Sequence, residues 1–207
     1  THVFPEGGDM NDTEISFDNE MKSPGMARFV GHALAGTVLQ VYDKAYFVDV
    51  DSIDVIKSDL IVPANMPKPE DMPLARKYAE LHLAGKDDEI PYKAMQLTTV
   101  VAEALRMVRM ENGPTEFSLP MSGVRLGNVA FIGIPGEPFT EIGVQIKTAE
   151  GYDMIMPCAL TNGYEGYFPV ESAYAEGGYE ARTSPFKAGV ADAIVNRAKE
   201  MLKELKK

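Results

Sequence analysis

The spacing of apolar residues predicts helices at several places along the chain. The segment from about Gly25 to Tyr42 has an apolar residue at every third or fourth position, so we expect one face of this helix to be buried. A short helix, 139–147, is expected to turn Ile142, Val144 or Ile146 inward. Three longer helices are expected around 74–83, 93–110 and 188–205, the first two closed by glycines and the last ending in lysines that suit the helix dipole.

Other segments have the patterns of strands and loops. The stretch AYFVDVDSIDVI alternates apolar and acidic residues, which predicts a half-exposed strand over 45–56. VRLGNVAFIGI and DMIMPCAL are short apolar runs between turn residues, which is typical of central strands buried on both faces. Residues 1–24 and the proline-rich stretch IVPANMPKPEDMP are predicted to be loops. Interleaved helices and strands predict a layered α/β fold with a mixed sheet and flanking helices, and residues 1–207 are expected to form one domain or a large part of one.

Charge and composition exclude some classes of partner and location for this chain. Acidic residues outnumber basic ones 31 to 20, and a net charge of −11 would repel a phosphate backbone, so no nucleic-acid partner is expected. The sequence has no apolar run of about 20 residues that could span a bilayer and no recognisable signal peptide, so we expect a soluble chain. Because Cys158 is the single cysteine, an internal disulfide is excluded. The sequence begins without methionine, which suggests a processed or trimmed piece.

Glu137 is the first candidate for chemistry. It stands in the turn that ends the apolar run of NVAFIGIPGEPF, and two interpretations remain open. Pro138 can begin a helix, in which case free backbone N–H groups at the helix N-terminus would stabilise the carboxylate. Alternatively, Glu137 lies at the carboxyl edge of a strand, where it can serve as a metal ligand or a general base.

Tyrosines form a second candidate cluster in the glycine-rich stretch TNGYEGYFPVESAYAEGGYEA. We expect Tyr164 and Tyr174 to cover a loop and cap the core, because tyrosine is amphipathic. Glycines flank Tyr167 and Tyr179 and permit close approach of the backbone, which favours a pocket wall at these two positions. A phenol can bind a metal or donate a hydrogen bond to an oxyanion.

Three motifs in this order, GNVAFIGIPGEPF, CALTNGYEGYFP and AYAEGGYEA, resemble the second half of the catalytic domain of the neutral/alkaline (non-lysosomal) ceramidases. The residues GGDM at 7–10, followed by FDNE at 17–20, are similar to the active-site loop of that family and the segment after it. The resemblance spans nearly the whole chain. It implies that residues 1–207 are the C-terminal portion of a ceramidase-like catalytic domain.

The resemblance also implies a chemistry. Members of the family are zinc-dependent amidohydrolases that cleave the amide bond of ceramide, with zinc held by two histidines, a glutamate and a tyrosine. Glu137 matches the glutamate ligand, Tyr167 matches the tyrosine ligand, and Tyr179 matches a tyrosine that hydrogen-bonds the reacting amide oxygen. The implied partner is ceramide or a related amide lipid at a membrane surface, and the implied location is extracellular or periplasmic.

The sequence departs from the family pattern in its histidines. The two zinc histidines of the family precede the active-site loop, close to which this sequence begins. His2, His32 and His82 are the only histidines, and none has a partner at ligand spacing, so they are interpreted as ordinary histidines. With two of four ligands, the isolated chain is expected to hold zinc weakly and to be inactive.

A second departure lies at Asn11, where the family has a serine. Asparagine has no hydroxyl for a base to activate, so an acyl-serine route is excluded at this position. Asn11 can still donate a hydrogen bond to a substrate carbonyl, and Asp9 can orient a ligand of the metal. Without the resemblance, an Asp and an Asn in a glycine-rich loop would be interpreted as a plain turn.

Three hypotheses remain open from the sequence. The first is a ceramidase-like zinc amidohydrolase of which this chain supplies only part of the site. The second keeps the fold without the chemistry, as a catalytically inactive module that binds a lipid or a glycan. The third is a half-domain completed by a missing N-terminal portion or by another polypeptide, because an incomplete sheet exposes unpaired edges.

Overall fold

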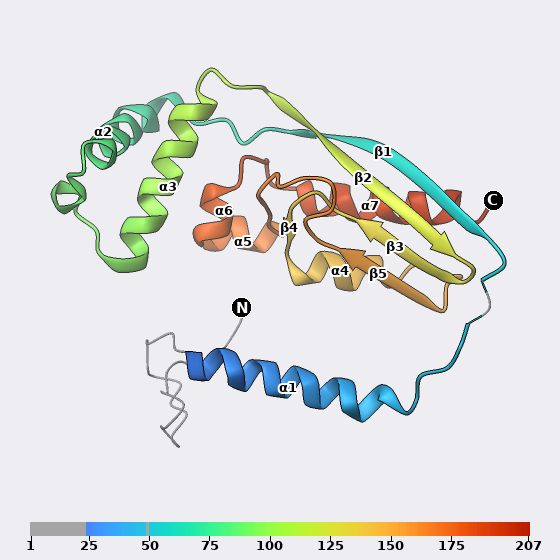
Figure 1. Cartoon of the computed structure of the whole chain (residues 1–207). Coiled ribbons are helices and arrows are strands. Elements are labelled where there is room, and N and C mark those ends of the chain that lie inside the picture. The colour runs from blue at the N-terminus through green and yellow to red at the C-terminus, as the bar shows by residue number, and fades with distance from the viewer. Residues whose placement is uncertain (1–23, 49) are drawn as a thin grey trace. The chain divides into compact units, whose positions relative to one another are not determined.

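The computed structural model describes residues 24–48 and 50–207, in two compact units that divide between Asp49 and Val50 (Figure 1). The loop predicted for residues 1–24 therefore lies outside the described residues, except for Pro24, which begins helix α1 (Pro24–Tyr42). Among the described residues, no helix is both long enough and apolar enough to cross a membrane.

Helix α1 confirms the first predicted helix but not its predicted burial. Its apolar side chains are largely exposed, with Phe29 at 44%, Leu34 at 64% and Val38 at 58%. Within its own unit the predicted burial is not seen, because the described part of this unit contains no second helix or strand against which α1 could pack.

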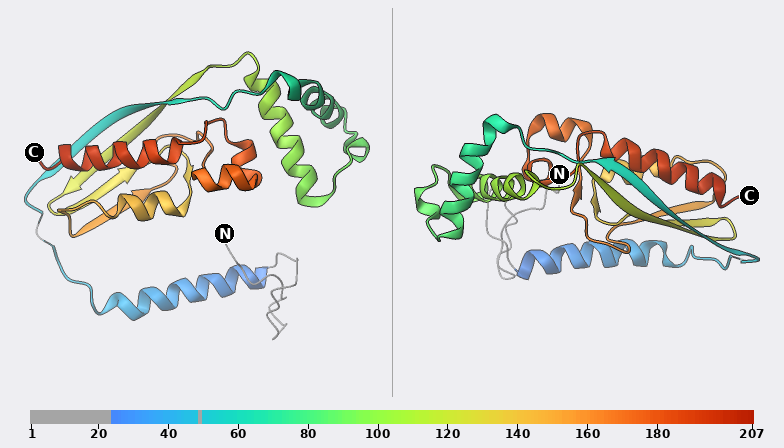
Figure 2. Two further views of the ribbon diagram at one scale, coloured as in Figure 1. Left: turned by 180° about the vertical axis from the view of Figure 1, so that it is seen from behind. Right: turned by 90° about the horizontal axis from the view of Figure 1, so that it is seen from above.

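The second unit is built on a four-stranded mixed sheet with the order β1-β2-β3-β5. Strands β1 (Ile53–Pro63), β2 (Glu116–Leu126) and β3 (Val129–Gly133) are antiparallel neighbours, and β5 (Met154–Cys158) pairs with β3 in parallel. The predicted layered α/β fold, with a mixed sheet and flanking helices, is confirmed (Figures 1 and 2).

Two strand boundaries differ from the prediction. The half-exposed strand begins at Ile53 rather than in the preceding AYFVDV stretch, and it continues through Pro63 into the predicted proline-rich loop. Its exposure alternates as expected for a strand with one face toward the core. Pro63 is tolerated because β1 is an edge strand and the proline is its last residue, where no further ladder donor is needed.

The apolar run VRLGNVAFIGI is two strands rather than one. Gly127, with φ +55°, and Asn128 turn the chain, so that β2 and β3 form an antiparallel hairpin. The run DMIMPCAL forms β5, as predicted, but β5 lies at the edge of the sheet and not at its centre. Met154 is accordingly 54% exposed.

The longer helices of this unit confirm the predicted ones. They are α2 (Met72–Leu83), α3 (Ala94–Met110), α4 (Thr140–Ile146) and α7 (Val190–Glu204). Helices α2 and α3 pack against each other around an apolar cluster of their own. The remaining elements are short: two 3-10 turns, Pro69–Asp71 and Asp87–Glu89; two-residue strands β4 (Glu137–Pro138) and β6 (Tyr167–Phe168); and helices α5 (Glu171–Glu176) and α6 (Tyr179–Thr183).

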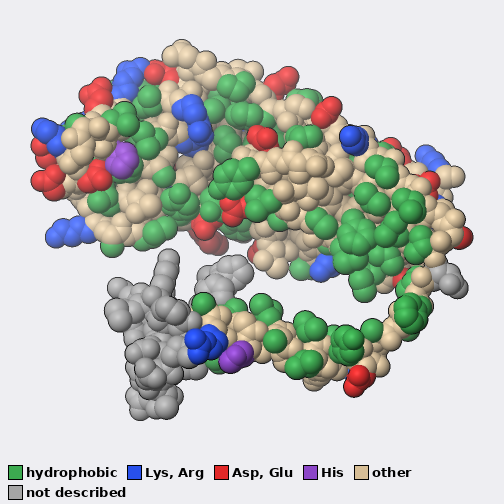
Figure 3. All heavy atoms as spheres, in the orientation of Figure 1, with side chains coloured by type: hydrophobic (Ala, Val, Ile, Leu, Met, Phe, Trp, Pro, Cys, Tyr) green, Lys and Arg blue, Asp and Glu red, His purple; other side chains and the backbone are tan. Residues whose placement is uncertain are grey.

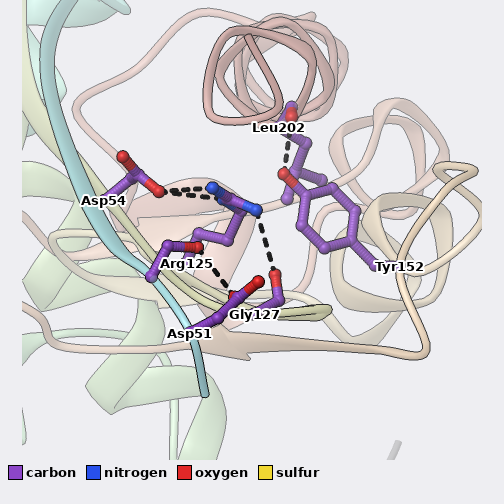
Figure 4. Close-up of polar contacts among 7 residues, drawn as sticks. Asp51, Asp54, Arg125, Gly127, Tyr152 and Leu202 are labelled. Atoms are coloured by element: carbon purple, nitrogen blue, oxygen red, sulfur yellow. Dashed lines mark hydrogen bonds and ion pairs between the residues drawn. The ribbon is translucent and has the colours of Figure 1, made fainter. Parts of the chain in front are cut away.

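The main core lies between one face of the sheet and helices α4 and α7. Ile142 and Ile146 of α4 are buried as predicted, whereas Val144 is 58% exposed because it lies on the opposite side of this short helix. The predicted apolar side of α7 is confirmed, and Ile194 and Met201 on it are fully buried. Polar contacts tie these layers together. Arg125 pairs with Asp54 across β1 and β2, and the Tyr152 hydroxyl donates to the Leu202 carbonyl over 2.7 Å (Figure 4).

The opposite face of the sheet carries two apolar rows that run across all four strands. One row begins at Val55 and the other at Ile53, both on the edge strand β1, and these two residues are 63% and 67% exposed. Figure 3 shows hydrophobic side chains gathered over this end of the sheet. The register gives the rows as Val55, Val124, Phe131 and Met156, and as Ile53, Leu126, Val129 and Met154.

Candidate functional site

The parallel β4–β6 pair places a carboxylate beside a phenol. Glu137 is the register partner of Tyr167, and the Glu137 N–H donates to the Gly166 carbonyl over 2.9 Å. Register partners project to the same side of a ladder, so the two side chains leave the pair together. The helix-terminus interpretation of Glu137 does not fit this arrangement, because α4 begins only at Thr140 and Pro138 is part of β4.

Glycines let β4 and β6 approach this closely. A Cβ atom on Gly136 would lie 2.5 Å from the Gly166 carbonyl oxygen and 2.7 Å from the Phe168 ring, so a larger residue cannot fit without displacement. Gly166 has φ +91°, a backbone conformation that other residues rarely adopt. The sequence signals for this contact are the glycines directly before Glu137 and Tyr167.

Tyr179 completes the cluster from a third element. It is the first residue of α6, and its ring meets that of Tyr167 edge to face, with ring centroids 6.2 Å apart and an interplanar angle of 77°. The structure therefore brings together Glu137, Tyr167 and Tyr179. The other two candidates, Asp9 and Asn11, lie outside the described residues.

The electrostatics of the cluster are set by the carboxylate. Partial burial raises the pKa of Tyr167, and the negative charge of Glu137 raises it further. The same charge raises the pKa of Tyr164, whose side chain is 72% exposed. Tyr164 thus belongs beside Glu137, and the prediction that it caps the core is wrong. Both phenols stay protonated at neutral pH and keep their O–H donors.

Tyr174 takes the packing role that the sequence predicted for it. Its ring is half-buried, and its hydroxyl donates to the Phe186 carbonyl over 2.7 Å. Burial raises the pKa of this phenol, so it remains a donor to the carbonyl at neutral pH. Tyr174 therefore links its own helix, α5, to the segment that follows α6.

Ser184 hydrogen-bonds the backbone of Tyr167 and so supports the site. The sequence alone does not identify this residue. This fully buried serine donates from Oγ to the Tyr167 carbonyl over 2.9 Å and accepts from the Phe186 N–H over 3.3 Å. Its own carbonyl accepts from Asn65 Nδ2 over 3.3 Å. No local pattern in the sequence singles out this serine, because its partners Tyr167 and Asn65 come from distant segments.

The donor chemistry of Glu137 and Tyr167 suits part of a zinc site. A carboxylate oxygen is an ordinary zinc ligand, and a phenol oxygen is the second donor that the family resemblance implies. Within 24–48 and 50–207, no group of three or more His, Cys, Asp and Glu residues could hold a metal ion. His32 is exposed on α1, and His82 Nδ1 lies 2.8 Å from Asp87 Oδ1. The described residues thus contain two of the four implied donors.

Comparison with solved structures identifies the fold. The chain superposes on the neutral ceramidase from Pseudomonas aeruginosa with a TM-score of 0.56 and 17% sequence identity, over 95% of this chain and 35% of that one. A ceramidase described as complexed with C2 aligns over 44% of this chain and 16% of that one, with a TM-score of 0.36 and 23% identity. No family profile and no curated protein matches the sequence. The chain spans about a third of the length of the Pseudomonas enzyme and has the fold of that part of a neutral ceramidase.

Proposed function

We propose that this chain is part of a ceramidase-like amidohydrolase that cleaves the amide bond of an N-acyl sphingoid base or a related lipid. One observation carries the proposal: the Glu137 carboxylate and the Tyr167 phenol are register partners, with the Tyr179 ring beside them, in a fold like that of a neutral ceramidase. The Pseudomonas enzyme is a ceramidase, which suggests the substrate class. A shared fold alone does not imply a shared activity, and the clustering of these three side chains is the reason to expect hydrolysis as well.

Glu137 and Tyr167 are assigned to hold zinc. When bound, zinc supplies Lewis acidity that activates water at neutral pH. Two donors make an incomplete site, so the remaining ligands come from polypeptide outside the described residues. The position of the Glu137 carboxylate beside the Tyr167 phenol supports this assignment, because a bound cation would neutralise the negative charge that, after the larger effect of burial, raises the pKa of Tyr167.

Tyr179 is assigned to the reacting amide. Its phenol donates a hydrogen bond to the amide oxygen, on which negative charge develops as the carbonyl carbon is attacked. The edge-to-face contact with Tyr167 fixes the direction of the Tyr179 ring. Asn11 and Asp9 keep the roles proposed from the sequence: Asn11 donates to the substrate carbonyl, and Asp9 orients a ligand.

The apolar rows on the outer face of the sheet support completion of the domain by further polypeptide. On this face, Val55 and Ile53 at one edge of the sheet and Met154 at the other edge are each more than half exposed. A sheet face of this kind is normally covered by another layer. The covering polypeptide is assigned to bring the missing metal ligands, and the substrate reaches the completed site from a membrane surface.

Metal content and amide hydrolysis test the proposal together. The longest obtainable form of the protein is assayed for bound zinc and for release of a fluorescent fatty acid from an N-acylsphingosine. We expect Glu137→Ala to lower both zinc content and hydrolysis, and Glu141→Ala, an exposed glutamate on α4, to change neither. Zinc binding and hydrolysis that survive Glu137→Ala would refute the assignment. Absence of both from the unmodified protein would favour the lipid- or glycan-binding module instead.

A further inference from the structure

A second site lies away from the tyrosine cluster, in a pocket between α3, α6 and the segment that follows β1. Its volume is about 210 Å³. Apolar side chains and charged groups form most of its wall, and the uncharged polar residues Asn65 and Tyr174 complete it. The apolar wall is contributed by Met66, Pro67, Met107 and Ala181, and the charged wall by Lys68, Asp71, Glu103, Arg106 and Arg182.

Arg106 is the unusual residue of this pocket. Its side chain is 7% exposed, although arginine is almost never buried without a partner of opposite charge. Its Nε donates to the Arg182 carbonyl over 2.9 Å, and its Nη1 donates to the Asn65 carbonyl over 2.7 Å. Both partners are neutral carbonyls, so no carboxylate bonds this guanidinium among the described residues.

The third nitrogen of Arg106, Nη2, has no hydrogen-bond acceptor among the described residues. No buried side-chain nitrogen or oxygen in that part of the chain lacks a partner, so Nη2 must reach solvent. The pocket is where Arg106 borders open space. Burial also lowers the pKa of Arg106, which indicates that the charged form has lost hydration that an anion in the pocket would replace.

The surrounding charges leave the pocket positive in an acidic protein. Glu103 accepts from both Nε and Nη2 of Arg182, so these two residues neutralise each other. Lys68 and Arg106 then face the single carboxylate of Asp71, whereas the chain as a whole has a net charge of −11. A singly charged anion balances this lining better than a doubly charged one.

We infer that the pocket between α3 and α6 binds a small carboxylate with a short aliphatic tail, its carboxylate on Arg106 Nη2 and Lys68 and its tail against Met66 and Met107. The planar guanidinium edge is suited to a carboxylate oxygen. The apolar wall is suited to a few methylene groups. This inference does not depend on the proposed hydrolysis.

Nuclear magnetic resonance of the Arg106 Nε–H group tests this inference, because its hydrogen bond to the Arg182 carbonyl protects it from exchange. The 207-residue chain is titrated with butyrate, with the neutral isostere butyramide and with inorganic phosphate, at constant ionic strength. We expect a saturable shift of this signal with butyrate, none with butyramide, and weaker binding of phosphate. A response to butyramide equal to that with butyrate, or tighter binding of phosphate, would overturn the inference.

Two variants that leave the Arg106 hydrogen bonds intact sharpen the test. Lys68→Gln removes an exposed charge from the pocket and is expected to weaken butyrate binding about two- to five-fold, as for a surface ion pair. Met66→Trp fills the pocket and is expected to abolish binding. Lys77→Gln, which changes an exposed lysine of α2 that does not line the pocket, is the control and is expected to bind butyrate normally. Unaltered binding in both pocket variants would refute the site.

Discussion

Glu137 and Tyr167 are 30 residues apart in the chain and lie opposite each other in the parallel β4–β6 pair. The carboxylate raises the pKa of the Tyr167 phenol by its charge, after the larger effect of burial. This coupling can be measured without substrate or metal. It therefore tests the geometry of the site separately from its chemistry.

Glu137→Gln is expected to lower the alkaline pH at which Tyr167 and Tyr164 ionise, because the substitution removes the negative charge that opposes tyrosinate. The measurement is the ultraviolet absorbance of tyrosinate as a function of pH. Glu141→Gln is the control, because this exposed glutamate of α4 contributes to neither pKa shift. Superimposable titration curves for Glu137→Gln and the unmodified chain would show that the carboxylate does not act on these phenols.

The same shifts predict how stability depends on pH. A tyrosine whose pKa is higher in the folded chain than in the unfolded chain favours folding by keeping its proton. This contribution is fully present below the unfolded pKa of about 10 and is lost as pH rises through the raised folded value. Denaturation by urea at increasing alkaline pH is expected to show a falling free energy of unfolding. A Tyr167→Phe chain should show a shallower fall, and an equally steep one would contradict the prediction.

Gly136→Ala and Gly143→Ala are expected to have opposite effects. At position 136 the added Cβ would meet the Gly166 carbonyl oxygen at 2.5 Å, so we expect a loss of about 1–3 kcal/mol, as for overpacking in a core. At position 143, within α4, the nearest atoms are 3.9 Å away, and alanine should stabilise the helix by about 0.5–1 kcal/mol. Urea denaturation of both variants measures these changes. Equal effects would contradict the close β4–β6 contact.

The helices could be predicted from the sequence because a helix with a buried face repeats its apolar residues at a regular local spacing. The apolar residues of α7 recur on one side, and Ile194 and Met201 on that side are buried against the sheet. The burial predicted for α1 is not seen within its own unit, although its spacing is equally regular. Spacing shows which face is apolar, but only tertiary structure decides what covers that face.

The strands and the site depended on contacts that local patterns do not contain. Nothing near Pro63 indicates that β2 would pair with it, so the proline-rich stretch was interpreted as a loop. Likewise, the residues around Glu137 allowed a helix terminus, and only the family resemblance placed Tyr167 beside it. The register of β4 and β6 joins segments far apart in the chain, and Ser184 has the same kind of distant partner.

Ser184→Ala is expected to destabilise the chain by about 1–3 kcal/mol, because it removes the buried hydroxyl that donates to the Tyr167 carbonyl and accepts from the Phe186 N–H. The free energy of unfolding in urea measures the loss. Ser172→Ala changes an exposed serine on α5 and is expected to have little effect. A loss of stability no larger than that of Ser172→Ala would show that the buried hydroxyl does not support the site.

The apolar rows on the outer face of the sheet are expected to make the isolated 207-residue chain bind a hydrophobic dye and self-associate, because patches of this kind are normally covered. Val55→Lys interrupts one row at an exposed position and should reduce both effects while changing stability by no more than about 0.5 kcal/mol. Lys57→Gln alters the same face of β1 without touching either row and serves as the control. Dye fluorescence and sedimentation velocity are the measurements. A compact monomer that binds no dye would contradict the need for a covering layer, and with it the proposal that further polypeptide completes the domain on this face.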